Sequence, residues 1–102
     1  MSHVPRLVAL FGPKRGITRE FDRVLRIGRA HDADLQLIDD RVSREHCTLE
    51  VTPEGVRLRD LNSRNGTWLN GKRVSRDVET ALGDRAEIKL ADSLALSFEV
   101  RR

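Results

Sequence analysis

The chain has 102 residues, and a domain of this size buries roughly 60–70% of its unfolded surface, which is enough for one core. Its hydrophobic content is 38%, and no apolar run approaches the ~20 residues of a membrane-spanning helix. Cys47 is the only cysteine, so an internal disulfide and a zinc site built on several thiolates are excluded. The net charge of +3 comes from 19 basic and 16 acidic residues that are interspersed, without a basic tail. We therefore expect a cytoplasmic single domain over residues 1–102, with 1–4 and 101–102 as terminal extensions and no contact with a membrane.

Apolar and polar residues alternate along nearly the whole chain, which predicts strands with one buried face. In chain order, the predicted strands span residues 6–11, 18–21, 24–27, 35–37, 47–51, 56–59, 67–69, 85–90 and 94–100. No stretch has the apolar stripe of an amphipathic helix. Many short strands separated by turn residues predict an all-β sandwich.

Two connections, residues 28–34 and 39–45, are too long for simple hairpins. The shorter connections contain the glycine and asparagine pairs that tight turns need, such as Asn65-Gly66 and Asn70-Gly71. Long loops on a rigid sheet scaffold are where binding groups concentrate. Candidate binding residues are therefore expected in the long loops.

Three polar clusters lie in loops or at strand ends: Gly28-Arg29, Ser43-Arg44-Glu45-His46 and residues 62–67. A phosphate dianion carries about −1.5 to −2 charges and three acceptor oxygens, so its site needs a bidentate arginine, a hydroxyl and backbone amides. Arg29, Ser43 and the amide of Arg44 offer that set. Asn65 adds donors and an acceptor that suit the main chain of an extended peptide. The clusters therefore predict a binding site for a phosphorylated peptide.

At these residues the sequence resembles the forkhead-associated (FHA) domain family, whose signature is Gly-Arg, then Ser-x-x-His, then Asn-Gly. Here the motifs are Gly28-Arg29, Ser43-Arg44-Glu45-His46 and Asn65-Gly66, and residues 60–71 and 82–84 are similar to the family's flanking segments. The resemblance implies a β-sandwich of about eleven strands in two sheets, with ligand-binding loops at one end. It also implies a non-catalytic signalling module that binds phosphothreonine. From the abrupt start of the chain and its end at Arg101-Arg102, we expect this module to be one domain of a larger protein.

The same resemblance implies a role for each motif residue. Arg29 and Ser43 would contact the phosphate, Arg44 would add an amide or side-chain contact, and Asn65 would bond the peptide backbone. The residues implied to support the binding loops are Gly28, His46, Ser63, Gly66 and Asn70. The implied partner is a phosphothreonine-containing protein or peptide produced by a serine/threonine kinase, and neither a cofactor nor a metal is expected.

Two positions depart from the family pattern, namely Asn62, where glycine is frequent, and Arg64, where threonine is frequent. Asparagine tolerates a positive φ better than other non-glycine residues, so the first change is mild. Arg64 leaves two alternatives open. Pointing inward, it adds a third guanidinium to the phosphate site and displaces a small hydroxyl that helps to select threonine over serine. Pointing outward, it is a surface residue.

The same residues allow three other functions. A phosphate-independent interaction scaffold of the same fold is the main alternative, but the presence of Arg29 and Ser43 argues against it. A basic nucleic-acid-binding domain is disfavoured because one tryptophan and three phenylalanines are the only aromatic residues for base stacking. Ser43, His46 and Asp60 have the side chains of a hydrolase triad, but the Gly-x-Ser-x-Gly elbow is absent, so we expect no enzymatic activity.

Overall fold

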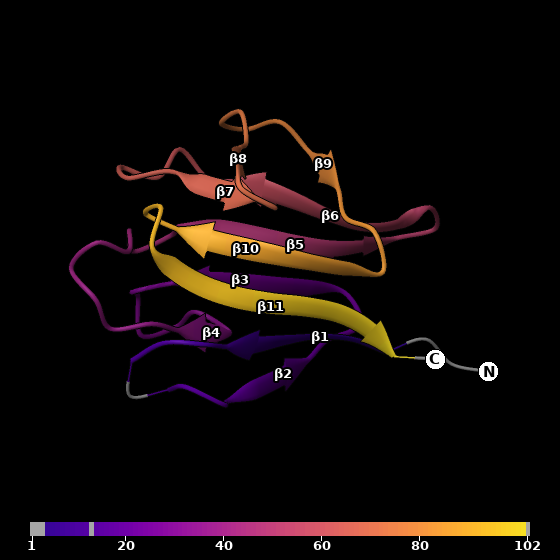
Figure 1. The fold of residues 1–102 in the computed structure, drawn as a ribbon, viewed down its shortest axis with the longest axis horizontal. Helices are drawn as coiled ribbons and strands as arrows, with labels where there is room; N and C mark the ends of the chain where they lie inside the picture. Colours follow the sequence, from indigo (N-terminus) through magenta and orange to yellow (C-terminus); the bar gives the residue numbers. More distant parts are fainter. Residues whose placement is uncertain (1–3, 13, 102) are drawn as a thin grey trace.

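The computed structural model describes residues 4–12 and 14–101. These residues contain eleven strands, which form two stacked sheets (Figure 1). The strands are β1 (Val4–Ala9), β2 (Thr18–Glu20), β3 (Val24–Gly28), β4 (Leu35–Gln36), β5 (Cys47–Thr52), β6 (Gly55–Asp60), β7 (Thr67–Leu69), β8 (Lys72–Arg73), β9 (Thr80–Ala81), β10 (Arg85–Leu90) and β11 (Leu94–Arg101). The order is β2-β1-β11-β10-β7-β8 in one sheet and β4-β3-β5-β6-β9 in the other. β3 and β4 run parallel, and the other paired strands run antiparallel. The predicted all-β sandwich is confirmed, and no helix that could cross a membrane occurs in the described residues.

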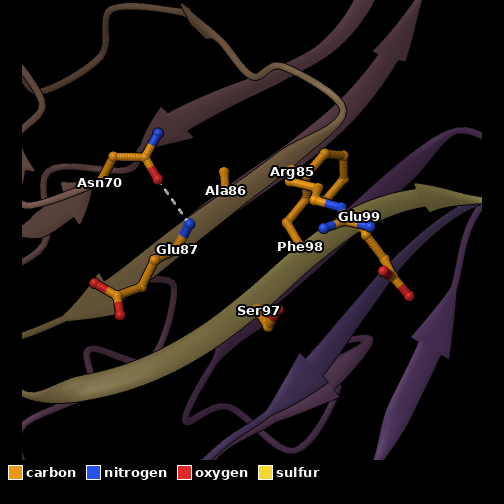
Figure 2. A pocket seen from close by; sticks show the side chains of 7 residues that line it. All are labelled: Asn70, Arg85, Ala86, Glu87, Ser97, Phe98 and Glu99. Carbon is orange, nitrogen blue, oxygen red and sulfur yellow. Dashed lines mark hydrogen bonds between the residues drawn. The ribbon is translucent and has the colours of Figure 1, made fainter.

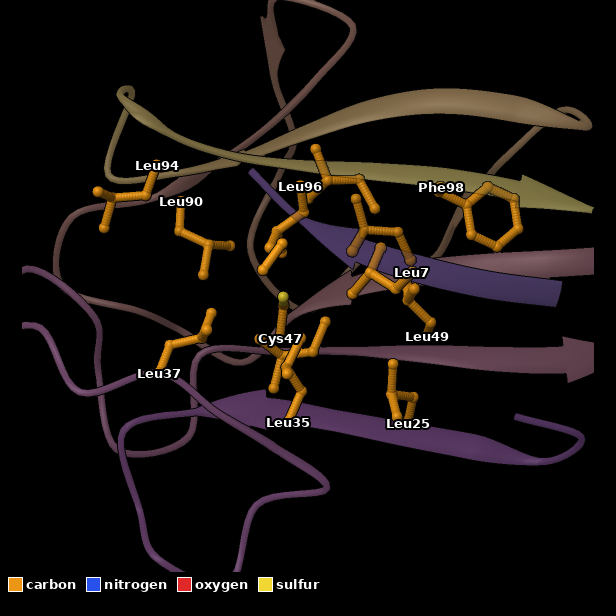
Figure 3. Close-up of a cluster of buried hydrophobic side chains, with 14 of the residues drawn as sticks. Leu7, Leu25, Leu35, Leu37, Cys47, Leu49, Leu90, Leu94, Leu96 and Phe98 are labelled. Atoms are coloured by element: carbon orange, nitrogen blue, oxygen red, sulfur yellow. The ribbon is translucent and has the colours of Figure 1, made fainter. Parts of the chain in front are cut away.

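The core lies between the two sheets and follows directly from the alternation in the sequence (Figure 3). Leu96 and Phe98 of β11 point inward from the six-stranded sheet, toward Leu25, Cys47 and Leu49 of the five-stranded sheet. Each fully buried side chain of this size contributes about 1.5–3 kcal/mol to folding. The two sheets therefore form the rigid scaffold on which the loops are mounted.

Nine of the eleven strands were predicted, with ends that differ by at most a few residues. The two missed strands are β8 and β9, which are two residues long and form an edge of each sheet. Lys72 and Arg73 of β8 are both exposed, so this strand has no buried face and produces no alternating pattern.

The ends of the described chain belong to the six-stranded sheet. Val4, the first residue of β1, pairs with Arg101, the last residue of β11. The expectation that residues 1–4 and 101–102 are terminal extensions is therefore wrong for Val4 and Arg101. Residues 1–3 and 102 lie outside the described residues.

The strand register brings the predicted binding loops to one end of the sandwich, on the left of Figure 1. Cys47 at the start of β5 pairs with Ile27 near the end of β3 and with Asp60 at the end of β6. In the other sheet, Thr67 at the start of β7 pairs with Leu90 at the end of β10. The loops that follow β3, precede β5 and connect β6 to β7 therefore meet at the same end.

Candidate functional site

Arg29 and Ser43, the two predicted phosphate ligands, are neighbours although they belong to different loops. The backbone N–H of Arg29 donates a hydrogen bond to the carbonyl of Ser43 at 2.9 Å. The Nε–H of Arg29 donates to the carbonyl of Val42 at 3.0 Å, which fixes the direction of the half-buried guanidinium. A guanidinium has five N–H donors, and this bond uses one of them. The terminal amino groups of Arg29 remain available to an anion.

The hydroxyl of Ser43 links two of the loops. Its Oγ accepts a hydrogen bond at 3.0 Å from the backbone N–H of Arg64, in the loop between β6 and β7. A hydroxyl accepts and also donates, so the proton of Ser43 is still free to bind a phosphate oxygen. The position of this hydroxyl is therefore fixed while its donor remains available.

Close approach of two backbones requires glycine at position 28. A Cβ added to Gly28 would lie 2.0 Å from the carbonyl oxygen of Arg44 and 3.1 Å from that of Ser43. Neither backbone atom can move away as the tip of a flexible side chain can. Gly28 thus allows the end of β3 to contact the Ser43 loop at a distance that any other residue would prevent.

His46 is completely buried and joins the Ser43 loop to the Asn65-Gly66 turn. Its Nε2 lies 2.8 Å from the carbonyl oxygen of Gly66, and because a carbonyl only accepts, Nε2 carries the proton. Its Nδ1 is then the acceptor for the backbone N–H of Ser43, at 3.1 Å. Burial lowers the pKa of the ring below its ordinary value of 6.5, so His46 is neutral at pH 7.

A second buried network holds the loop between β6 and β7. The carboxylate of Asp60 accepts hydrogen bonds from the Ser63 hydroxyl at 2.5 Å, the Ser63 backbone N–H at 3.0 Å and the Thr67 hydroxyl at 2.6 Å. The Ser63 Oγ in turn accepts from the backbone N–H of Gly66 at 3.0 Å. These hydrogen bonds join both ends of the loop to each other. They therefore fix the backbone from which the Asn65 side chain projects.

Asn65 is exposed, and the nitrogen of its side-chain amide already makes a hydrogen bond within the chain. Its Nδ2 donates to the carbonyl of Arg41 at 2.9 Å, across the gap between the two loops. The Oδ1 has no hydrogen-bond partner among the described residues. Asn65 can therefore accept a hydrogen bond from the N–H of an extended peptide without losing its own support.

Arg44 and Arg64 have solvent-exposed side chains, and neither guanidinium has a hydrogen bond or ion pair within the described part of the chain. Their main chains are nevertheless fixed, since the carbonyl of Arg44 accepts from the N–H of Ala30 at 3.1 Å and the N–H of Arg64 donates to Ser43. Both guanidinium groups are thus free for a ligand at a site whose backbone is already in position.

Asn70 follows the end of β7 that lies opposite to Thr67, away from the binding loops, and Figure 2 shows its side chain beside Glu87 of β10. Its side-chain oxygen accepts from the backbone N–H of Glu87 at 2.8 Å, and its own N–H donates to the Glu87 carbonyl at 2.8 Å. It lines an open hollow of about 460 Å³ on the β10–β11 side of the sheet, beside Arg85 and Ser97. The expectation that Asn70 supports the binding loops is wrong, because the whole of β7 separates it from them.

Arg41 is the residue of this region that sequence reasoning missed. Its guanidinium binds both carboxylate oxygens of Asp39, at 2.9 and 2.8 Å, and lies 3.2 Å from the Ser93 hydroxyl. The side-chain hydrogen bond from Arg41 lowers the pKa of the Asp39 carboxyl to about 2. Because the carbonyl of Arg41 holds Asn65, this pairing also stabilises the site. The only signal in the sequence is an acidic residue two positions before an arginine, which is too common to be specific.

The three side chains of the considered hydrolase triad do not form one. His46 Nδ1 accepts from the backbone of Ser43, not from its hydroxyl, and Asp60 bonds to Ser63 and Thr67 instead of to His46. A triad requires a hydrogen bond from the nucleophile to the base and from the base to the carboxylate. The residues act here as structural links between loops.

Known proteins contain the same sequence features. The pattern of the FHA domain family matches residues 25–91, which include every candidate site residue. The ABC transporter ATP-binding/permease protein Rv1747 of Mycobacterium tuberculosis is 50% identical over 50 residues, or 49% of this chain and 6% of that protein. The FHA domain-containing protein At4g14490 of Arabidopsis thaliana is 29% identical over 100 residues, or 93% of this chain and 26% of that protein. The chain therefore spans a small part of these relatives.

Solved structures agree with the sequence match. The N-terminal FHA domain of Saccharomyces cerevisiae Rad53p, in complex with a phosphothreonine peptide, has a TM-score of 0.82 and 25% sequence identity. The superposition covers 96% of this chain and 94% of that one. Since the family pattern matches more than half of the sequence and the folds coincide, the chain belongs to the FHA domain family.

Proposed function

We propose that this chain is a non-catalytic module that binds phosphothreonine-containing proteins or peptides at the end of the sandwich. One observation carries the proposal: the backbones of Arg29 and Ser43, from separate loops, are hydrogen-bonded to each other, and both the Arg29 guanidinium and the Ser43 hydroxyl keep unused hydrogen-bond donors. An arginine and a hydroxyl at a fixed mutual position form the donor set that a phosphate group requires. The phosphate would receive hydrogen bonds from both.

The remaining site residues would position the ligand around that phosphate. The exposed guanidinium groups of Arg44 and Arg64 would add favourable charge to the site. The free Oδ1 of Asn65 would accept from a main-chain N–H of the peptide and hold it in register. Affinity would therefore come from charge, and orientation from the asparagine.

The family relationship supports this reading, because the Rad53p FHA domain was solved with a phosphothreonine peptide. A serine/threonine kinase would produce the ligand, so a cytoplasmic location, where such kinases have access to ATP, is part of the proposal. We further propose that the chain forms one domain and acts within a larger signalling protein, since it covers 6% and 26% of two relatives.

Binding of peptide libraries tests the function. We would measure fluorescence anisotropy with a degenerate peptide library that carries one fixed phosphothreonine, and with the same library unphosphorylated. Charged hydrogen bonds contribute about 1.5–3 kcal/mol, so Arg29→Ala is expected to weaken binding about 10- to 150-fold. The control is Arg85→Ala, which removes the same charge from an exposed position at the far end of β10. Its affinity should stay within about twofold of the native value.

Two results would contradict the proposal. Equal binding of the phosphorylated and unphosphorylated libraries would favour the phosphate-independent scaffold. An equal loss of phosphopeptide affinity in the Arg29→Ala and Arg85→Ala variants would mean that the net charge of the chain, and not the proposed site, attracts the peptide.

A further inference from the structure

Ser75 lies in the loop between β8 and β9, at the top of Figure 1. Every other serine or threonine that the structure describes belongs to a strand or uses its hydroxyl in a hydrogen bond, as Ser43, Ser63 and Ser93 do. Ser75 is exposed, and its hydroxyl makes no hydrogen bond to any described residue. Its Oγ is therefore available for chemical modification.

Basic residues surround Ser75 in the sequence. Lys72 and Arg73 lie three and two positions before it, and Arg76 follows it directly. All three side chains are exposed, and none forms an ion pair within the described part of the chain. Three cations against the single carboxylate of Asp77 give residues 72–77 a net charge of +2. Protein kinases select substrates partly by such charge patterns, so this segment suits a kinase with acidic groups around its substrate cleft.

Few contacts hold the chain around Ser75 to the sandwich. β8, which precedes it, is an edge strand of two exposed residues. The N–H of Val74 donates to the Thr67 carbonyl at 3.0 Å. Beyond Ser75, the N–H of Asp77 donates to the Asp60 carbonyl at 2.9 Å. An exposed edge segment of this kind opens locally at low cost, so it can enter the cleft of a kinase in extended form.

Arg73 connects Ser75 to the Asn65-Gly66 turn. Its guanidinium carbon lies 5.2 Å from the centre of the Trp68 ring. The same guanidinium covers Gly66, since a Cβ added there would lie 2.8 Å from its Nε and 2.9 Å from its Nη2. Residues two apart in an extended chain point to the same side, and Arg73 and Ser75 line one open hollow of about 240 Å³. A phosphate on Ser75 would therefore lie within reach of Arg73.

We propose that Ser75 is a phosphorylation site for a kinase that selects basic residues before the serine, and that the new phosphate binds Arg73. In this step the Ser75 Oγ forms a bond to the terminal phosphorus of ATP, its proton passes to a carboxylate base of the kinase, and ADP leaves. A phosphoserine carries about −1.5 to −2 charges. Because a charged hydrogen bond is stronger than the stacking of an exposed guanidinium on a ring, Arg73 moves from Trp68 and Gly66 to the phosphate.

Phosphorylation of Ser75 also changes the charge beside the proposed phosphopeptide site. Gly66 follows Asn65, so the modification neutralises the Arg73 cation next to the turn that carries Asn65 and adds negative charge there. A phosphothreonine peptide is then attracted less strongly. This consequence rests on the phosphothreonine-binding function proposed above, whereas the modification of Ser75 does not.

The first test is phosphate transfer to the folded chain. The probe enzyme is the catalytic subunit of cyclic-AMP-dependent protein kinase, which selects basic residues before serine, and mass spectrometry locates the phosphate. We expect transfer to Ser75, with a rate about tenfold lower in Arg73→Gln. The control Arg85→Gln removes the same charge from an exposed position of β10 and should keep the native rate. If thermal unfolding shows that Arg73→Gln is not folded, Lys72→Gln takes its place.

The second test follows the consequences of the modification in the phosphorylated chain. Trp68 is the only tryptophan, so its emission should shift to longer wavelength when Arg73 leaves the ring. Phosphorylated Arg73→Gln should show no such shift relative to its unmodified form. Anisotropy with the phosphothreonine library should show an affinity at least about twofold lower at low salt, and high salt should reduce the difference because it screens exposed charges.

Three results would contradict these proposals. A native chain that stays unmodified at Ser75, whether or not the denatured chain accepts phosphate, would overturn the modification site. Unchanged Trp68 emission after phosphorylation would overturn the binding of the phosphate by Arg73, and unchanged library affinity would overturn the effect on the binding site. An unmodified chain that fails to prefer phosphothreonine would refute the proposed function instead, and phosphate transfer with Trp68 emission would still decide the role of Ser75.

Discussion

Replacing Gly28 with alanine tests how the end of β3 is packed against the Ser43 loop. The new Cβ would lie 2.0 Å from the Arg44 carbonyl oxygen and 2.8 Å from its carbonyl carbon. Ordinary contacts between such atoms are about 3.5 Å or longer, so the two backbones must separate by more than an ångström. That movement would break the hydrogen bonds from Arg29 and Ala30 to the carbonyls of Ser43 and Arg44.

The cost can be worked out from these contacts. Overpacking costs about 1–3 kcal/mol, and each lost backbone hydrogen bond costs about 0.5–1.5 kcal/mol. Gly28→Ala should therefore lower the free energy of unfolding by about 2–6 kcal/mol, a large part of the stability of a small domain. Phosphopeptide affinity should also fall in the molecules that remain folded, because Arg29 and Ser43 no longer lie side by side.

Urea denaturation followed by circular dichroism measures this change. The matched control is Gly83→Ala, because the nearest atom to a Cβ at Gly83 is 4.0 Å away and its φ is not in the left-handed region. There the lower entropy of the unfolded chain should raise stability by up to about 1 kcal/mol. A Gly28→Ala chain as stable as the Gly83→Ala chain would refute the close packing.

Three further predictions concern the buried groups behind the site. His46→Gln should lower the free energy of unfolding by about 1–3 kcal/mol in urea, because the links to Ser43 and Gly66 are lost. Burial lowers the pKa of His46, so the unfolded chain takes up a proton at a pH where the native ring is still neutral. Native stability is then fully present above about pH 6.5 and falls below it, and His46→Gln should lose that part of the slope. Burial raises the pKa of the Cys47 thiol far above its ordinary value, so a thiol reagent should react with it only after denaturation; fast reaction of the native chain would contradict this. Asp60→Asn should destabilise the chain by about 1–3 kcal/mol, measured in the same way, because a buried acceptor of three hydrogen bonds is altered.

The strands were predictable wherever one face is buried, because a period of two appears directly in the sequence. Leu94, Leu96 and Phe98 alternate with polar or small residues, and all three are buried. The edge strands β8 and β9 bury little, so nothing in the sequence marked them.

Asn62 has a φ of 60°, which confirms that asparagine adopts the positive φ at this position.

The candidate site was predictable in its residues but not in its connections. Arg29, Ser43 and Asn65 were predictable because each belongs to a short motif that can be identified from the neighbouring residues alone. The hydrogen bond from Asn65 to Arg41 depends on how two loops meet, and single-sequence patterns contain no information on that. Asn70 was misplaced for the same reason, since its closeness to Gly66 in the chain says nothing about which end of β7 it occupies.

The location of the bound phosphate tests the central claim most directly. A crystal structure of the chain with a phosphothreonine peptide selected from the library would show it. We predict phosphate oxygens within hydrogen-bond distance of the Arg29 guanidinium and the Ser43 Oγ, with Asn65 bonded to the peptide backbone. A phosphate bound elsewhere on the sandwich, with Arg29 and Ser43 in contact only with solvent, would contradict the account.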